Sequence, residues 1–346
     1  MQVVTACFDR SAEPHFATVL IRWTFFPLLV GSILAGCPSE PSAPSADAGS
    51  LDAPSRDSAL DAPAPDASEE PCLGYETPER VGQVISPLIV ECSGLVASGD
   101  YPEVLWLHND SGDEPRVFAI SREGDLLAVV DIEGAAHRDW EDIAIERRDG
   151  VDYLWVGDIG DNARSRPAID IYRFPEPDIS GLSSTSVRAE QLTLTYPEGS
   201  SYDAESLAWD PPSGSLMIVT KDHGGESLVF DTGGPPRWSE GEQALTQVAE
   251  IRINRDGARS SYATAMDISP SGERMIIRTY SEVMEWTRQT SEPWSDVLIR
   301  PRQVIRAASE DQGESIGFYP NGLGYLTLSE GSDQFVYAAG PLAMCP

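Results

Sequence analysis

Five short segments of this 346-residue chain repeat one pattern, and together they decide the fold. They read Ser93-Gly-Leu-Val-Ala, Glu141-Asp-Ile-Ala-Ile, Glu205-Ser-Leu-Ala-Trp, Thr264-Ala-Met-Asp-Ile and Glu314-Ser-Ile-Gly-Phe. Each begins with a side chain that carries an oxygen atom and continues with alternating apolar positions, which is the period of a half-buried β-strand. The segments start 48, 64, 59 and 50 residues apart, so each opens a long repeat.

Each repeat continues with further strand signals that are separated by turn residues such as Pro212-Ser-Gly and Pro270-Ser-Gly. The second repeat, for example, contains Tyr153-Leu-Trp-Val, Asp170-Ile-Tyr-Arg-Phe and Leu192-Thr-Leu-Thr. Four antiparallel strands per repeat predict an all-β, five-bladed β-propeller, with six blades as the alternative. Because the last repeat has almost no chain left for a fourth strand, we expect the N-terminal strand Val81 to Ile85 to complete it and close the ring.

The first 36 residues have the form of an export signal. Arg22 precedes the apolar run Trp23 to Ala35, which is too short to span a bilayer. The run ends in Leu34-Ala-Gly-Cys37, which resembles the lipobox of bacterial lipoproteins. The resemblance implies a signal peptide over 1–36 and acylation of the Cys37 thiol. Asp9 and Glu13 are unusual in a basic leader, so translation from Val19 is an alternative start.

The chain after Cys37 changes composition twice, which divides it into a tether and a domain. Residues 37–72 are mostly Pro, Ala, Ser and Asp, and so little apolar surface cannot offset the entropy of folding. Residues 73–346 carry the repeats and form the propeller domain. We therefore expect a monomer in the cell envelope, anchored in a bacterial membrane through Cys37. Pro38, in place of an aspartate, favours the outer membrane over the inner one.

The chain is strongly acidic, with a formal net charge of −32. Nucleic acid is thus not an expected partner, because phosphate binding needs clustered Lys and Arg. Three cysteines remain beside Cys37 and the leader's own: Cys72, Cys92 and Cys345. An oxidising envelope permits one disulfide among them, and both Cys72–Cys345 and Cys72–Cys92 are open from the spacing.

The polar residues that open the five segments should form a ring around the propeller axis, because the first strand of each blade lines the central channel. These residues are Ser93, Glu141, Glu205, Thr264 and Glu314. Converging carboxylates repel one another unless a cation neutralises them. Calcium suits such a ring because it accepts irregular shells of oxygen ligands. The alternatives are protonation, solvation or pairing with Lys221 or Arg278, and Glu91 could replace Ser93 as a ligand.

This ring resembles that of the calcium-activated nucleotidases (apyrases), which are five-bladed propellers with serine and glutamate ligands from successive blades. Here the motifs are Ser93-Gly-Leu followed by Asn109-Asp-Ser-Gly-Asp, and Glu141-Asp-Ile-Ala followed by Trp155-Val-Gly-Asp-Ile-Gly. Two positions depart from the family, because Asn109 replaces an aspartate and Ser111 an arginine. The chain is also similar to an uncharacterised bacterial propeller family related to the esterase-like phytase proteins. The first resemblance implies metal-dependent hydrolysis of phosphate esters, which the two departures put in question.

Polar residues at strand ends are the candidates for contact with a substrate over the metal. We expect Asp110, Asp158, Lys221 and Arg278 to be catalytic, with the two cations at nearly equivalent positions as phosphate clamps. Asp161, Asn162, Arg164, His223 and Tyr280 are further candidates, and each of these residues could instead bond one blade to the next or shape a turn. Trp140, Trp155, Trp209 and Trp286 are expected to pack between blades. No serine-hydrolase elbow, zinc-site spacing or phosphate-binding glycine loop is present.

Two functions therefore follow from the sequence. One is a calcium-dependent phosphoester hydrolase outside the cytoplasm. The other is a non-catalytic envelope protein whose propeller face binds a protein or a glycan.

Overall fold

The computed structural model describes residues 74–181, 184–221, 226–238, 241–253 and 262–342. Every described residue lies in one compact unit, Ala67–Pro346. The leader, Cys37 and the tether therefore lie outside the described residues, as do His223, Cys72 and Cys345. No helix of the described part is both long and apolar enough to cross a bilayer.

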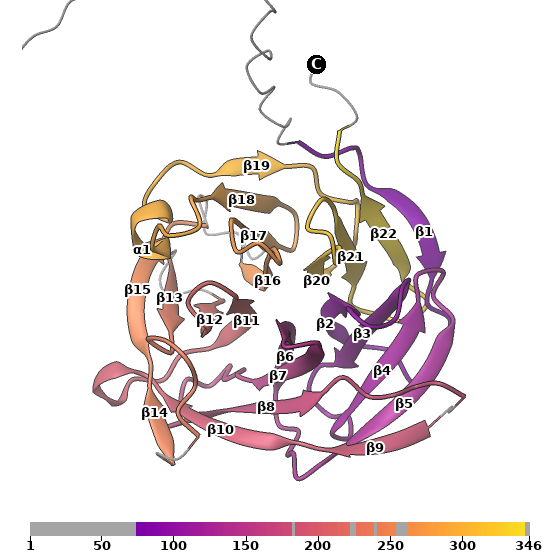
Figure 1. Cartoon of the computed structure of the whole chain (residues 1–346), viewed down its shortest axis with the longest axis horizontal. Helices are drawn as coiled ribbons and strands as arrows, with labels where there is room; N and C mark the ends of the chain where they lie inside the picture. The colour runs from indigo at the N-terminus through magenta and orange to yellow at the C-terminus, as the bar shows by residue number, and fades with distance from the viewer. Residues whose placement is uncertain (1–73, 182–183, 222–225, 239–240, 254–261, 343–346) are drawn as a thin grey trace, which may run out of the picture. The chain divides into compact units, whose positions relative to one another are not determined.

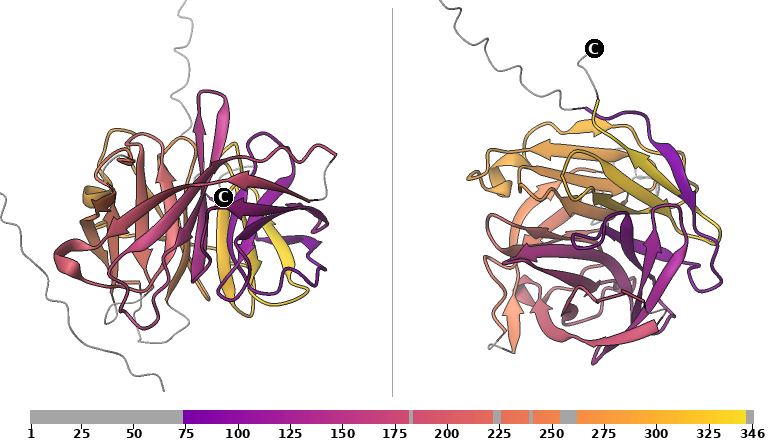
Figure 2. Two further views of the ribbon diagram at one scale, coloured as in Figure 1. Left: turned by 90° about the horizontal axis from the view of Figure 1, so that it is seen from below. Right: turned by 45° about the vertical axis from the view of Figure 1, so that its right-hand side comes forward.

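Five β-sheets surround one axis, so the fold is the predicted five-bladed β-propeller (Figure 1). The five quoted segments form the innermost strands. These are β2 (Cys92–Ala97), β6 (Trp140–Arg148), β11 (Ala204–Asp210), β16 (Ala263–Ile268) and β20 (Gly313–Phe318). We number blades 1 to 5 after these strands. Figure 2 shows the same blades in two further views.

Each blade continues outward through two more strands. The second strands are β3 (Val104–Asn109), β7 (Val151–Asp158), β12 (Ser215–Thr220), β17 (Arg274–Thr279) and β21 (Tyr325–Ser329). The third strands are β4 (Arg116–Ser121), β8 (Ile169–Pro175), β13 (Ser227–Asp231), β18 (Val283–Thr287) and β22 (Phe335–Ala339).

The hydrophobic core is divided into five clusters, and each lies between two neighbouring blades. A blade therefore buries both of its faces, and four of the five inner strands are buried along their whole length. The expectation of half-buried inner strands was wrong for this reason. Trp140, Trp155, Trp209 and Trp286 lie in these clusters, as expected for blade packing.

The fourth strands confirm the predicted closure of the ring. They are β5 (Leu126–Glu133), β10 (Glu190–Thr195), β15 (Thr246–Ile251), β19 (Gln303–Ile305) and β1 (Glu79–Gln83). The N-terminal strand β1 pairs antiparallel with β22 and completes blade 5. It begins two residues before the predicted Val81.

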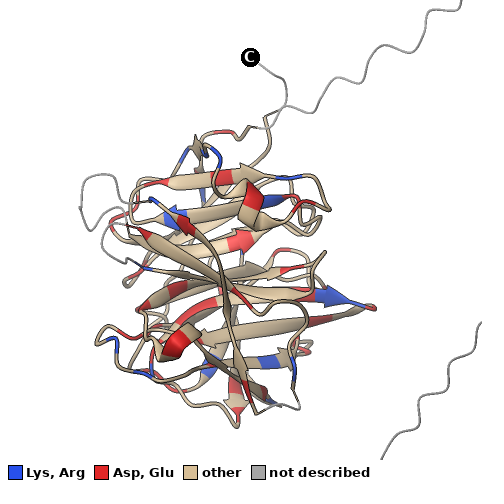
Figure 3. Ribbon diagram, turned by 90° about the vertical axis from the view of Figure 1, so that its left-hand side faces the viewer, with Lys and Arg blue, Asp and Glu red and all other residues tan. Residues whose placement is uncertain are grey.

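Two further strands pass between blades and were not predicted. Strand β9 (Ser184–Arg188) comes between β8 and β10 in sequence but pairs in parallel with β5 of blade 1. Strand β14 (Glu242–Ala244) comes between β13 and β15 but pairs in parallel with β10 of blade 2. The short helices η1 (Pro197–Gly199) and α1 (Trp294–Val297) lie in connections. On the side that carries β15 and α1, acidic and basic positions are interspersed (Figure 3).

Candidate functional site

The five predicted ring residues occupy one structural position, the second residue of each innermost strand. In every blade the pairing with the second strand shifts at that residue, so each has no partner across the ladder. Such a β-bulge bends the strand and re-aims the side chain. All five side chains are buried. A bulge repeated once per blade therefore sets the ring Ser93, Glu141, Glu205, Thr264 and Glu314.

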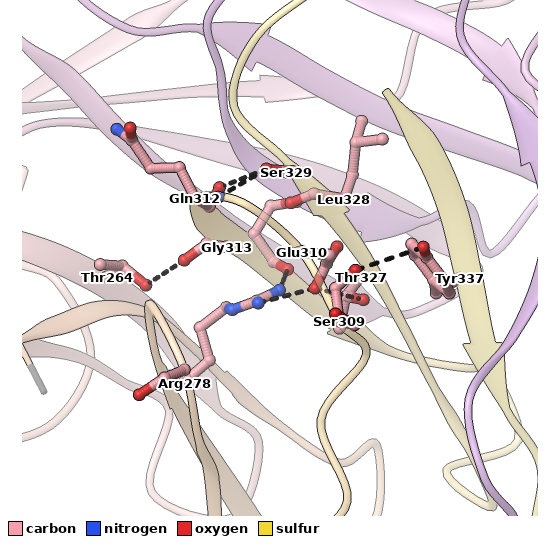
Figure 4. Close-up of polar contacts among 12 residues, drawn as sticks. Thr264, Arg278, Ser309, Glu310, Gln312, Gly313, Thr327, Leu328, Ser329 and Tyr337 are labelled. Carbon is pink, nitrogen blue, oxygen red and sulfur yellow. Dashed lines mark hydrogen bonds and ion pairs between the residues drawn. The ribbon is translucent and has the colours of Figure 1, made fainter. Parts of the chain in front are cut away.

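The two hydroxyl groups of the ring connect neighbouring blades. Ser93 Oγ donates to the backbone carbonyl of Glu141 at 2.6 Å. Thr264 Oγ1 donates to the backbone carbonyl of Gly313 at 2.8 Å, as Figure 4 shows. These bonds run from blade 1 to blade 2 and from blade 4 to blade 5. Both hydroxyl groups therefore bond one blade to the next.

The ring glutamates of blades 2 and 3 gather further carboxylates around them. Three ligand atoms, one each from Asp110, Asp139 and Glu141, lie within 4.8 Å of one another. The same holds for Glu141, Asp203 and Glu205. Glu141 is common to both groups of three. These acidic groups could bind a metal ion, because closely spaced carboxylate oxygens are the ligands that hard cations prefer. We call the five residues the acidic cluster.

Asp139 and Asp203 were not predicted, although the sequence carries a signal for them. Each lies two residues before a ring glutamate, in the repeated pattern Asp139-Trp-Glu and Asp203-Ala-Glu. In blades 1 and 3 the residue after the second strand bonds to this position, from Asp110 N to Glu91 O and from Lys221 N to Asp203 O. Asp110 and Lys221 therefore face the same end of the channel as the ring.

Gly160 lies against the acidic cluster with no room for a side chain. A Cβ atom there would be 2.2 Å from Glu141 Oε1 and 2.5 Å from Asp139 Oδ2. Its backbone N–H donates to the carbonyl of Asp139 at 3.2 Å. The loop after β7 thus fixes two carboxylates of the cluster by close backbone approach.

Burial and mutual repulsion raise the pKa values of Asp110, Asp139, Glu141 and Glu205. Burial, followed by the charges of Glu205 and Asp110, raises the pKa of Glu141 well above its usual value. Burial and the neighbouring aspartates raise the pKa of Asp139 to about 6. Protonation or a cation relieves this repulsion.

Lys221 supplies a positive charge at this end of the channel. Its ammonium forms an ion pair with the carboxylate of Glu205, and it lies 5.8 Å from the centre of the Tyr280 ring. Tyr280 is the residue of blade 4 that corresponds to Lys221, because Thr220 pairs with Ala204 as Thr279 pairs with Ala263. Of the predicted substrate-facing residues, Asp110, Lys221 and Tyr280 come to one end of the channel.

Glu314 belongs to neither group of three and lies on the blade 5 side of the ring. Gln312 Nε2 donates to Glu314 Oε1 at 2.8 Å and also bonds to Glu330. Burial, followed by the charge of Glu330, raises the pKa of Glu314 to about 8. Glu330, which the sequence analysis did not single out, occupies the same position in blade 5 as Lys221 does in blade 3.

Arg278 lies one pair deeper in its blade than predicted and connects blades (Figure 4). It pairs with Ala265, so its counterpart in blade 3 is Val219 and not Lys221. The guanidinium is buried, donates to the carbonyl of Ser315 at 3.0 Å and bonds to Glu310 at 2.7 Å. The expected pair of phosphate clamps is therefore not formed by Lys221 and Arg278.

Asp158 is also buried and committed to a partner. It forms an ion pair with Arg166 at 2.7 Å. Asp161 accepts bonds from the backbone N–H groups of Ser165 and Arg166, so it shapes the turn after β7. Asn162 is exposed in this turn, and Arg164 has a positive φ of 50° there.

Below the ring, aspartates that were not predicted tie the inner strands together. Asp142 Oδ2 accepts from the backbone N–H of Leu207 at 2.8 Å and of Met266 at 3.2 Å, which joins blade 2 to blades 3 and 4. Asp267 Oδ2 accepts from Phe318 N at 2.7 Å and joins blade 4 to blade 5. Burial raises the pKa of Asp267 to about 7.

A cavity of about 280 Å³ opens between blades 2 and 3, at the end of the inner strands opposite to the ring. Arg147, Arg148 and Arg173 line it together with Trp209 and Trp238. Trp238 is 36% exposed and stacks on Trp155, with ring centres 5.6 Å apart. The arginines meet carboxylates, among them Glu146 and Glu190. We call this the arginine–tryptophan pocket.

No family model and no curated protein matches the chain. Among solved structures, the chain is similar to the crystal structure of Myxococcus xanthus glutaminyl cyclase, with 13% identity and a TM-score of 0.45. The match covers 79% of this chain and all of the other. The resemblance to calcium-activated nucleotidases and to the phytase-related family stays a prediction from the motifs.

Proposed function

We propose that the ring end of the channel binds calcium, and that the protein is an extracytoplasmic propeller held to a bacterial membrane by a lipid on Cys37. The observation that supports the metal site is the position of Glu141, which belongs to both groups of three acids. In each group, the three ligand atoms lie within 4.8 Å of one another. The membrane anchor and the tether are inferred from the sequence alone.

The donor chemistry of the acidic cluster fits a hard divalent cation. All five side chains offer carboxylate oxygens, they come from three blades, and Gly160 packs closely against Glu141 and Asp139. Calcium is preferred over magnesium because it tolerates irregular shells of six to eight oxygens. Bound there, the ion would neutralise the repulsion between carboxylates and could polarise an oxygen of a ligand above it.

Hydrolysis of a phosphate ester would rest on fewer residues than the sequence indicated. Asp110 belongs to the acidic cluster and Lys221 lies beside it, whereas Arg278 and Asp158 are buried and paired. Lys221 has three N–H donors, so it could bind a phosphate oxygen beside its ion pair with Glu205. We therefore place cation binding first and hydrolysis second.

Thermal unfolding of the full-length protein in detergent, with chelator and then with calcium or magnesium, tests the site. A ligand at one hundred times its Kd stabilises the folded state by about 2.7 kcal/mol, so binding is visible as a higher Tm. Glu141→Gln should lose the calcium response. Glu146→Gln is the matched control, because Glu146 lies on the same strand, is also buried and pairs with Arg148 at the opposite end. Wild-type protein that does not respond to calcium would remove the proposal.

The arginine–tryptophan pocket favours a second candidate function, the binding of a ring-shaped acidic ligand such as a carboxylated sugar. Exposed tryptophan faces stack on rings, and arginine pairs with carboxylates. Quenching of tryptophan fluorescence by oligogalacturonate, absent in Trp238→Ala and absent with the neutral sugar, would support it. Equal quenching by both sugars would contradict it.

A further inference from the structure

The connection between β7 and β8 is longer than the connection between the second and third strands of any other blade. It spans residues 159–168, which we call the β7–β8 loop. The other connections span residues 110–115, 221–226, 280–282 and 330–334. Loops on a rigid scaffold often carry binding groups, so a long loop beside the acidic cluster is a candidate for a role in the metal site.

Two consecutive residues of the β7–β8 loop contact the acidic cluster through their backbone. Gly160 N donates to the carbonyl of Asp139 at 3.2 Å, and a Cβ atom on Gly160 would be 2.2 Å from Glu141 Oε1. Asp161 N donates to Asp203 Oδ1 at 2.8 Å. The backbone of this loop therefore contacts three members of the acidic cluster, two from blade 2 and one from blade 3.

Arg166 fixes the conformation of the β7–β8 loop. Its Nη1 atom donates to the carbonyl of Gly160 at 2.8 Å and to Asp158 Oδ1 at 2.7 Å. Its backbone N–H donates to Asp161 Oδ2 at 2.7 Å, and its carbonyl accepts from Ser201 Oγ at 2.7 Å. One residue therefore joins the end of β7, the turn that follows it and the segment before β11.

The ion pair between Arg166 and Asp158 is specific to blade 2. The side chain of Asp158 is 1% exposed and that of Arg166 is 13% exposed, so water screens their attraction little. Asp158 pairs with Trp140, the residue before the ring glutamate. In the other blades the register places at this position Asn109, Thr220, Thr279 and Ser329. None of these is acidic, so the carboxylate is confined to the blade with the longest loop.

We infer that Arg166 is a positioning residue of the calcium site, an inference that rests on the proposed function. Arg166 holds the β7–β8 loop in the conformation that orients three members of the acidic cluster. Within the part of the chain that the structure describes, Arg166 forms no ion pair with the cluster itself, so it acts through Gly160 and Asp161. Groups that orient metal ligands contribute about 10- to 100-fold to metal affinity.

The charge of Arg166 acts in the opposite direction, which separates positioning from electrostatics. Burial and the neighbouring aspartates raise the pKa of Asp139, and the nearby charge of Arg166 offsets part of this rise. A positive charge at this place also repels a cation, so removal of the charge alone would tighten calcium binding. Loss of positioning would weaken calcium binding. Weaker binding by a neutral variant therefore identifies the positioning role.

Calorimetric titration of the full-length protein in detergent with calcium, at a temperature at which every variant is folded, measures this effect. Arg166→Met should raise the Kd for calcium by about tenfold or more. Arg166→Lys, which keeps the charge and a donor, should raise it less. Arg288→Met is the matched control, because Arg288 also donates to a glycine carbonyl, that of Gly272 at 2.7 Å, and pairs with a buried aspartate, Asp210. Asp210 ends β11 at the opposite end of the channel, so this variant should lose stability and keep its Kd for calcium.

Hydrogen–deuterium exchange in the presence of chelator gives a readout that needs no calcium. The amide of Asp161, which is bonded to Asp203 in the wild type, should exchange faster in Arg166→Met and at the wild-type rate in Arg288→Met. Unchanged exchange of the β7–β8 loop, or unchanged or tighter calcium binding by Arg166→Met, would overturn the role of Arg166 and leave the calcium site standing. Wild-type protein that binds no calcium would remove the site and its positioning residue together.

Discussion

Replacement of Lys221 by glutamine should destabilise the calcium-free protein and tighten calcium binding. Lys221 is the counter-ion of Glu205, and their side chains are 20% and 3% exposed. Removal of one partner from a fully buried pair costs about 3–5 kcal/mol, and exposed pairs contribute less than about 1 kcal/mol. For this partly exposed lysine we expect a loss of about 2 kcal/mol. A bound cation supplies the missing charge, so by linkage calcium should bind the variant about thirtyfold more tightly.

Denaturant unfolding of Lys221→Gln and wild type, each with chelator and with saturating calcium, measures both effects. The difference in unfolding free energy between the two proteins should be large with chelator and close to zero with calcium. Arg252→Gln is the control, because Arg252 pairs with Glu226 on the surface with its side chain 71% exposed. Weaker calcium binding by Lys221→Gln, or an equal deficit in both conditions, would refute the reasoning.

Three further changes test other parts of the structure. Because the pKa of Asp267 is about 7 when folded, against 3.8 unfolded, the folded state holds an extra proton between these values. The contribution of this group to the free energy of unfolding should therefore fall as the pH rises from about 4 to 7. In denaturant titrations, Asp267→Asn should reduce the dependence of the unfolding free energy on pH. An unchanged dependence would contradict the raised pKa of Asp267. Gly160→Ala should abolish the calcium-induced rise in Tm by displacing Glu141, and a retained response would show that the close approach is unimportant. Arg278→Ala should lower the free energy of unfolding by about 3 kcal/mol, because Glu310 stays buried without its partner. The calcium affinity, measured by calorimetry, should not change. A loss of calcium affinity would place Arg278 in the metal site.

The fold could be predicted from the sequence because each blade repeats a local pattern. Each repeat contains its ring residue, the following strands and the turns between these strands, so Glu141 and Glu205 were aligned correctly. The unpaired N-terminal strand could be assigned to the last blade by counting. Strands β9 and β14 could not be found in this way, because their short segments pair in parallel with a different blade, and no local signal encodes that partner.

The site was predicted in part, and its errors follow from register. Arg278 was aligned with Lys221, although Tyr280 is the true counterpart. The bulge recurs in both blades, so Tyr280 follows Thr264 at the same distance as Lys221 follows Glu205, and counting from the ring residue would have found it. Asp139 and Asp203 could have been found, because both lie two residues before a ring glutamate. Asp142 could not, since its bonds to Leu207 and Met266 cross the channel to other blades.

The exchange of outer strands has a consequence for how the ring comes apart. Strand β9 follows β8 of blade 2 but pairs in blade 1, and β14 follows β13 of blade 3 but pairs in blade 2. The N-terminal strand β1 pairs in blade 5 and leads into blade 1. Among the blades as described, only blade 4 shares no strand with a neighbour. Arginine side chains from that blade reach its neighbours instead: Arg288 to Asp210, Arg274 to the carbonyl of Gly322, and Arg278 to Glu310.

Blades 1, 2 and 3 should therefore lose amide protection together, as one cooperative unit. Blade 4 is attached to its neighbours by two hydrophobic clusters and by side-chain bonds, but by no described shared strand, so we expect it to open first. Its ion pairs Arg278–Glu310 and Arg288–Asp210 are buried, so salt should screen them little. The order in which the blades open should therefore follow the exchange of outer strands, while the hydrophobic clusters hold every blade in the ring.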